Sequence, residues 1–137
     1  AGPFSRVVGM RRIEEVEPPA GLSWDAVVAS LREAGAVFAY VHGSRADARH
    51  RKTSDLDIAA WFGRRVQSWN VKLPSQVDLL VLDSAGLELA GRVAQRGVLL
   101  FDDDPPTRVA WQADRCKRYL DEAHRRRELV ATVFDDG

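Results

Sequence analysis

The stretch that decides the fold is residues 40–58, which read Tyr-Val-His-Gly-Ser-Arg-Ala-Asp-Ala-Arg-His-Arg-Lys-Thr-Ser-Asp-Leu-Asp-Ile. It leaves one apolar run, turns at Gly43-Ser44, passes through a basic segment and enters a second apolar run at Asp55-Leu56-Asp57. Short apolar runs bounded by turn residues are typical of buried strands. The stretch therefore predicts two strands joined by a polar loop.

The residues around this stretch predict alternating helices and strands. Ser23 is suited to cap a helix over residues 24–34 that ends at Gly35. Strands are predicted at residues 36–41, 56–62, 77–82 and 98–101, and residues 63–76 are predicted to form an irregular connection. Further helices are predicted at residues 44–49, from Asp83 or Ser84 to Arg96, and at 107–130. This order predicts an α/β (α+β) fold in which helices flank a small mixed β-sheet.

The long C-terminal helix carries apolar residues at alternating steps of four and three. That spacing predicts one apolar stripe packed against the sheet, with charged residues on the other faces. The stripe consists of Val109, Ala113, Cys116, Leu120 and Ala123.

The Gly43-Ser44 turn is the first candidate binding feature. Glycine lets a backbone approach a phosphate closely, a helix beginning at Ser44 would point free N–H groups at it, and the hydroxyl adds a donor. Ser54 is placed to orient the segment that follows. Taken alone, a Gly-Ser pair is more often a simple strand-to-helix turn.

Three aspartates form the second candidate feature. Asp55 and Asp57 are two apart on a strand and so point to one face. Two adjacent carboxylates repel each other unless a cation lies between them, and oxygen ligands suit Mg²⁺. Asp78 lies in the run Val-Asp-Leu-Leu-Val, where a carboxylate is costly to bury without a partner. If its strand neighbours that of Asp57, the three complete a two-metal site with Asp78 as general base or metal ligand.

Four cationic side chains, Arg45, Arg49, Arg51 and Lys52, lie between the turn and the carboxylates. They can neutralise phosphate oxygens, and Arg45 is the first candidate because it adjoins the turn. Their commoner role in proteins is a solvated basic loop.

Composition limits the function further. The 137 residues fit one domain, residues 11–137, and residues 1–10 are interpreted as a disordered or tag-derived lead. Lysine plus arginine number 20 and aspartate plus glutamate also 20, which argues against non-specific binding to nucleic acid. No apolar run is long enough to span a bilayer, and the single cysteine fits the reducing cytoplasm.

Together, Gly43-Ser44, ten intervening residues, Asp55-x-Asp57 and Asp78 in a strand resemble the nucleotidyltransferase superfamily with the polymerase beta-like fold. Within it, the chain looks most like the minimal nucleotidyltransferases, the MNT-domain antitoxins, over residues 23–101. The resemblance implies an ATP site with two Mg²⁺ ions, where Gly43 and Ser44 hold phosphates and the three aspartates hold metals. One departure lies in residues 63–76, which lack the helix that many relatives have there, so the nucleobase or acceptor side of the site is open to change.

Relatives of this size commonly pair with a HEPN-type ribonuclease toxin. They are understood to neutralise it by attaching AMP to a tyrosine and by direct association. The resemblance thus implies a Mg²⁺-dependent protein adenylyltransferase that acts on a cognate HEPN toxin. Two alternatives remain open. One is a small-molecule (aminoglycoside-like) nucleotidyltransferase, and the other is a non-catalytic antitoxin that docks through the C-terminal helix with Arg125, Arg126 and Arg127.

Overall fold

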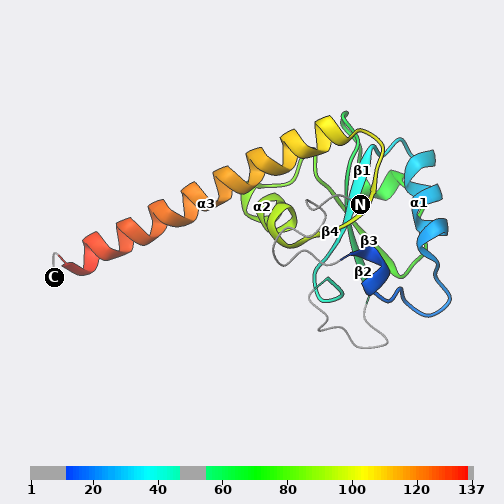
Figure 1. Ribbon diagram of the computed structural model, residues 1–137, viewed down its shortest axis with the longest axis horizontal. Helices are drawn as coiled ribbons and strands as arrows, with labels where there is room; N and C mark the ends of the chain where they lie inside the picture. The colour runs from blue at the N-terminus through cyan, green and yellow to red at the C-terminus, as the bar shows by residue number, and fades with distance from the viewer. Residues whose placement is uncertain (1–11, 47–54, 136–137) are drawn as a thin grey trace.

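The computed structural model describes residues 12–46 and 55–135, with side chains up to residue 130. The predicted lead at residues 1–10 therefore lies outside the described residues. In chain order, the elements are η2 (Ile13–Glu15), α1 (Trp24–Glu33), β1 (Phe38–His42), β2 (Leu56–Trp61), η3 (Ser68–Asn70), β3 (Val77–Val81), α2 (Leu87–Arg96), β4 (Val98–Asp102) and α3 (Pro105–Asp135) (Figure 1).

The strands form the mixed sheet that the sequence predicts. Their order is β3-β2-β1-β4. β1 runs antiparallel to both β2 and β4, whereas β2 and β3 are parallel. The crossover between the two parallel strands consists of residues 62–76, which contain only the short η3 turn. β3 is consequently an edge strand that is reached by an irregular connection, as expected.

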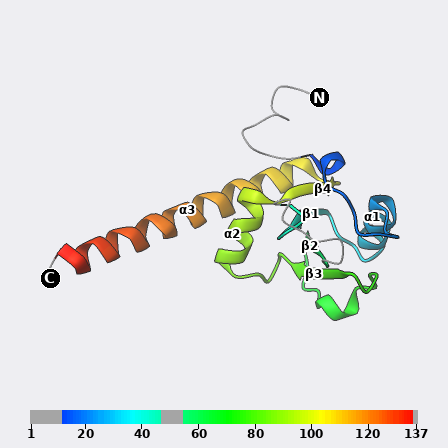
Figure 2. The same ribbon diagram turned by 90° about the horizontal axis from the view of Figure 1, so that it is seen from below.

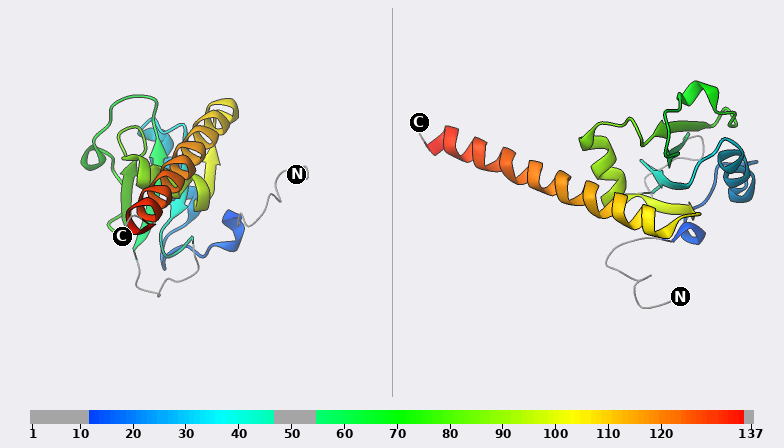
Figure 3. Two further views of the ribbon diagram at one scale, coloured as in Figure 1. Left: turned by 90° about the vertical axis from the view of Figure 1, so that its left-hand side faces the viewer. Right: turned by 90° about the horizontal axis from the view of Figure 1, so that it is seen from above.

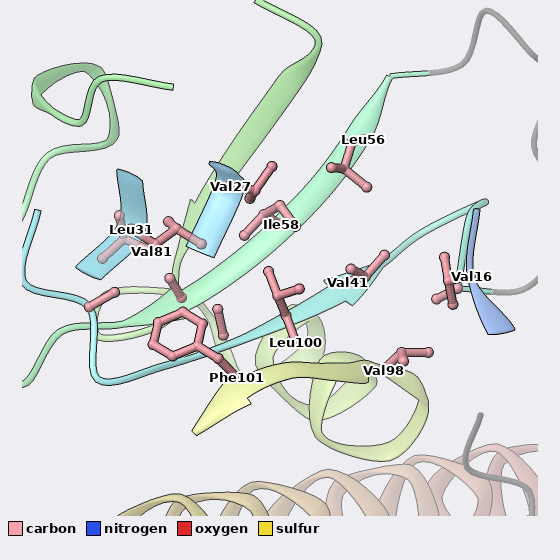
Figure 4. Packing of buried hydrophobic residues seen from close by; sticks show 14 of the residues in the cluster. Val16, Val27, Leu31, Val41, Leu56, Ile58, Val81, Val98, Leu100 and Phe101 are labelled. Carbon is pink, nitrogen blue, oxygen red and sulfur yellow. The ribbon is translucent and has the colours of Figure 1, made fainter. Parts of the chain in front are cut away.

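α1 covers one face of the sheet. Val27 and Leu31 of α1 are fully buried against Ile58 of β2 and Val81 of β3 (Figure 4). Burying a side chain of this size contributes about 2 kcal/mol. The helix begins as predicted, because the Ser23 side chain accepts a hydrogen bond of 3.1 Å from the Ala26 N–H. It ends at Glu33, and Gly35, whose φ of 95° lies in the left-handed region, directly follows the C-cap residue Ala34.

α2 and the first half of α3 cover the opposite face (Figure 2). Its centre is aromatic: Phe38 stacks on Trp61 with ring centroids 5.3 Å apart and also contacts Trp111 of α3. Residues two apart on a strand share a face, so this aromatic face is also the face of Tyr40, His42 and Asp57.

The start of α2 differs from the prediction. The helix begins at Leu87 after Gly86, so neither Asp83 nor Ser84 caps it. The carboxylate of Asp83 instead accepts hydrogen bonds of 2.9 and 2.8 Å from the N–H groups of Phe62 and Gly63. Asp83 therefore stabilises the end of β2. This contact joins residues that are distant in the sequence, so the local pattern does not indicate it.

The short helix predicted to begin at Ser44 is also absent where the structure describes the chain. Residues 43–46 form a turn, and residues 47–54 lie outside the described ranges. The described residues 43–46 therefore do not provide the helix N-terminus that the sequence predicted for phosphate binding.

The predicted apolar stripe of α3 was wrong in its orientation. Val109 is 52% exposed and Leu120 is 50% exposed, whereas Trp111 is buried. A polar network fixes the rotation of the helix, because Gln112 accepts a hydrogen bond of 2.8 Å from the Tyr40 hydroxyl and one of 3.0 Å from Arg108. A part-buried polar network of this kind favours one rotation of the helix, and the spacing of apolar residues does not encode it.

The C-terminal half of α3 projects beyond α2, away from the sheet (Figure 3). Tyr119, against which Gly91 of α2 packs, marks the region where the helix leaves the body of the domain. Within the described ranges, no helix, α3 included, combines the length and hydrophobicity that crossing a membrane requires.

Candidate functional site

The ends of three neighbouring strands meet at one end of the sheet. β1 ends at His42 and runs antiparallel to β2, so His42 is paired with Asp57 near the start of β2. β3 runs parallel to β2, and the Cα partner of Asp57 across this pair is Asp78. Asp55 precedes Asp57 by two residues, and Gly43 follows His42. The structure therefore brings together the turn and the carboxylates that the sequence singles out.

Gly43 lies directly against the Asp57 carboxylate. Its φ of 72° is a left-handed conformation that side-chain-bearing residues rarely adopt. A Cβ at this position would collide with Asp57 Oδ2 and would lie 3.2 Å from Asp57 Cγ. Glycine is therefore needed both for the backbone conformation and for the space that the carboxylate occupies.

The electrostatics of the cluster centre on Asp57. Burial raises the pKa of the Asp57 carboxyl, the His42 ring opposes this, and the charges of Asp78 and Asp55 add to the increase. Burial lowers the pKa of the His42 imidazole, although both Asp57 and Asp78 act in the other direction. A half-buried carboxylate beside two like charges is an arrangement that a cation would relieve.

A pocket of about 440 Å³ adjoins the turn. We call it the α2 pocket, because α2 contributes half of its lining residues. These residues are His42, Gly43, Ala46, Leu89, Arg92, Val93, Arg96 and Tyr119. Arg96 supplies positive charge, as does Arg92, which is also paired with Glu88 at 3.1 Å, and the leucine, valine and tyrosine supply apolar surface. The pocket thus places a cationic and partly apolar wall next to the Gly43 turn.

The comparison with family models decides the family. Residues 29–106 match the model described as polymerase beta, nucleotidyltransferase, and this match covers more than half of the 137 residues. The chain belongs to the polymerase beta nucleotidyltransferase family. The matched span runs from within α1 to the start of α3, and so includes Gly43, Asp57, Asp78 and the α2 pocket wall up to Arg96.

Solved structures share the fold of this nucleotidyltransferase. A chain in the crystal structure of a toxin–antitoxin with AMP-PNP matches with a TM-score of 0.68 and 22% identity, over 82% of this chain and 99% of that chain. A chain in the crystal structure of the toxin–antitoxin MntA-HepT gives a TM-score of 0.60 and 19% identity, over 81% and 96%. A chain in the rebuilt structure of the tri-AMPylated Shewanella oneidensis HEPN toxin in complex with MNT antitoxin gives 0.61 and 20%, over 81% and 95%. A comparison with curated proteins finds no match.

The carboxylates of this nucleotidyltransferase have the chemistry that Mg²⁺ requires. Within the described residues, no group of three or more His, Cys, Asp or Glu side chains is arranged to hold a metal ion by itself. Mg²⁺ is ordinarily bound by one or two carboxylates together with substrate phosphates and water, and not by a cage of protein ligands. The hard oxygen donors of Asp55, Asp57 and Asp78, and the raised pKa of Asp57, therefore fit an ion that arrives with a nucleotide.

Of the remaining predicted site residues, the structure describes only Ser44 and Arg45. Ser44 lies in the turn beside Gly43 and is half-buried. Arg45 is 2% exposed, and its Nη1 donates a hydrogen bond of 3.0 Å to the Glu17 carbonyl. This contact ties the segment before α1 to the turn, which gives Arg45 a structural role that its position in the sequence does not indicate. Ser54 and the rest of the basic loop, with Arg49, Arg51 and Lys52, lie outside the described residues.

Sequence reasoning missed the α2 wall of the pocket. Arg92 and Arg96 are four residues apart, so they share one face of a helix. That face lies beside the buried stripe of Ala90, Val93 and Ala94. The sequence pattern alone could therefore have indicated two arginines at the border of the buried face of α2. The close approach of α3 to this wall could not be predicted from the sequence, because it is a contact between two separate helices. It depends on Gly91 of α2, where a Cβ would lie 2.6 Å from Tyr119 Cγ of α3.

Proposed function

We propose that this nucleotidyltransferase is an MNT-type antitoxin. In this proposal it transfers AMP from ATP to a hydroxyl, that of a tyrosine, on a cognate HEPN ribonuclease toxin and thereby neutralises the toxin. The setting proposed is the cytoplasm, which the single cysteine fits. The observation that carries the proposal is the register that pairs Asp57 with Asp78 while Gly43 packs against Asp57.

The similar structures support the choice of acceptor and nucleotide. One of them is a toxin–antitoxin with AMP-PNP, and another contains a tri-AMPylated HEPN toxin in complex with MNT antitoxin. In our proposal, the triphosphate lies between the Gly43 turn and Arg92 and Arg96 of the α2 pocket. The apolar part of the pocket, with Val93 and Tyr119, then receives the nucleoside.

The proposed reaction is an in-line substitution at the α-phosphorus of ATP. The acceptor oxygen forms a new bond to this phosphorus while the bond to the bridging oxygen of the β-phosphate breaks. Pyrophosphate leaves with the electron pair of that bond, and the hydroxyl proton passes to a carboxylate, for which we propose Asp78. When bound, two Mg²⁺ ions held by Asp55, Asp57 and Asp78 would neutralise phosphate charge and polarise the reacting oxygens.

The test is direct transfer to the partner. The protein is incubated with ATP, Mg²⁺ and the HEPN-type protein encoded next to it, and the partner is weighed by mass spectrometry. We expect the partner to gain one or more AMP masses, and we expect the Asp55→Asn, Asp57→Asn double variant to lose this transfer. Asp25→Asn is the matched control, because Asp25 is an exposed aspartate of α1 on the opposite side of the sheet. An unmodified partner in a complex that demonstrably forms would refute the proposed reaction.

A non-catalytic antitoxin that acts by docking is the second candidate, and α3 favours it. The projecting half of this helix exposes three large apolar side chains: Leu120, Leu129 and Val130. A partner that covers these apolar side chains would stabilise this half of the helix. The same double variant separates the two candidates. If it neutralises the toxin as fully as the unchanged protein, docking suffices and AMP transfer is dispensable.

A further inference from the structure

A second hollow lies on the other side of the carboxylates from the α2 pocket. It is a groove of about 240 Å³ between the residue 68–75 segment and the strand β3. We call it the β3-edge groove. Trp69, Val77, Asp78 and Leu79 are among its lining residues. Asp78 therefore belongs both to the carboxylate cluster and to this groove.

Trp69 is the outstanding side chain of the groove. It is 78% exposed, the largest value among the exposed large hydrophobic residues that the structure describes. The other three tryptophans are buried or half-buried. Trp69 lies on the short η3 turn, and exposed aromatic side chains of this kind are frequent anchors of protein interfaces.

The outer edge of β3 carries backbone groups that no strand of the described residues pairs. The Leu56 N–H donates to the Gln76 carbonyl, and the Leu82 N–H donates to the Ala60 carbonyl. In a parallel ladder with this register, the backbone N–H and C=O groups of the even-numbered residues of β3 point toward β2. The N–H and C=O groups of Leu79 and Val81 consequently point to the outer edge, where no strand of the described residues pairs with β3 (Figure 2).

The order of the strands places this edge on one side of the reaction centre. The α2 pocket lies over the end of β1, Asp57 lies on β2, Asp78 lies on β3, and the β3-edge groove follows. In an in-line substitution, the attacking and leaving oxygens lie on opposite sides of the phosphorus. If the pyrophosphate occupies the α2 pocket side, the acceptor has to approach from the side of Asp78 and β3.

We propose that the β3-edge groove is the acceptor site, and that it binds an extended segment of the partner protein that carries the acceptor hydroxyl. The segment pairs with the free backbone groups of Leu79 and Val81 and lays an apolar or aromatic side chain on Trp69. Its hydroxyl then reaches Asp78, which takes the proton as the oxygen–phosphorus bond forms and pyrophosphate leaves. This inference rests on the proposed function, because it assigns the acceptor side of the same reaction.

The first measurement separates acceptor binding from nucleotide binding. In Trp69→Ala, we expect the KM for the HEPN-type partner to rise about tenfold, the effect of removing one interface anchor. The dissociation constant for a fluorescent ATP analogue should not change. Val109→Ala is the matched control, because it also truncates an exposed large apolar residue, but in the first half of α3. An unchanged KM in Trp69→Ala, or a larger rise in Val109→Ala, would overturn the inference.

The second measurement does not depend on transfer. In the Asp55→Asn, Asp57→Asn variant, acrylamide quenching of tryptophan fluorescence reports mainly on Trp69. We expect the partner to protect this fluorescence, and the protection to disappear in the same variant carrying Trp69→Phe. Protection without transfer by the unchanged protein would contradict the proposed reaction but support the groove as a binding site. Transfer without protection would contradict the groove and leave the reaction standing.

Discussion

Replacing Gly43 by alanine tests whether the turn and the carboxylate cluster act as one unit. The change adds a single methyl group to a residue whose φ is 72°. The methyl carbon would collide with Asp57 Oδ2, so the carboxylate has to rotate away. The substitution thus disturbs the proposed metal ligand without removing any polar atom.

Two costs contribute to the change in the free energy of unfolding. A residue with a side chain in the left-handed region costs about 1–2 kcal/mol. Moving the Asp57 side chain away from its rotamer costs on the order of 1 kcal/mol more. The effect on transfer should be larger, because displacing a reacting group by an ångström lowers the rate by about 100-fold.

Gly21→Ala supplies the matched control. Gly21 has a φ of 81°, but a Cβ there would meet nothing within 4 Å. It should lose about 1–2 kcal/mol through backbone strain alone and keep its transfer activity. Unfolding is measured with denaturant, and transfer is measured as the initial rate of AMP incorporation into the partner.

Two results would refute this reasoning. If Gly43→Ala transfers AMP as fast as Gly21→Ala, the position of the Asp57 carboxylate does not matter for the reaction. If the stability loss of Gly43→Ala stays the same in an Asp57→Ala background, the two residues are not coupled, since coupled neighbours deviate from additivity.

Three other substitutions test the carboxylate cluster and the α2 wall of the pocket. Asp57→Asn should stabilise the metal-free protein at neutral pH. The reason is that the pKa of the Asp57 carboxyl is raised in the folded state, so the folded protein loses stability as the pH rises through that pKa. The gain from asparagine should vanish well below the ordinary pKa of 3.8, and thermal unfolding at several pH values would measure it. Arg96→Gln should weaken binding of an ATP analogue about tenfold, whereas Arg118→Gln, which changes an exposed arginine of α3 paired with Asp114, should not, as fluorescence titration would measure. Gly91→Ala should destabilise the protein by about 1–3 kcal/mol despite the better helix propensity of alanine, because the new methyl group meets the ring of Tyr119, and denaturant unfolding would measure the loss.

The sequence by itself determined the local elements and the residue types of the site. The Ser23 cap, the Gly35 stop and the four apolar runs are set within a few neighbouring residues, so they were predicted close to their observed bounds. Asp55 and Asp57 share a face because the side-chain period of a strand is two. The family resemblance also depended only on residue identity and spacing, and the family match confirmed the nucleotidyltransferase fold.

Only the tertiary structure decided how distant segments meet. The parallel pairing that sets Asp78 opposite Asp57 joins residues that are separated by the whole residue 62–76 connection. The burial of Arg45 against Glu17 and the use of Asp83 at the end of β2 likewise depend on non-local contacts. The rotation of α3 follows from the hydrogen bond between Tyr40 and Gln112, not from its apolar stripe. Local patterns specify which face of an element is apolar, but long-range packing selects its neighbours, and those neighbours define the pocket and the groove on either side of the carboxylates.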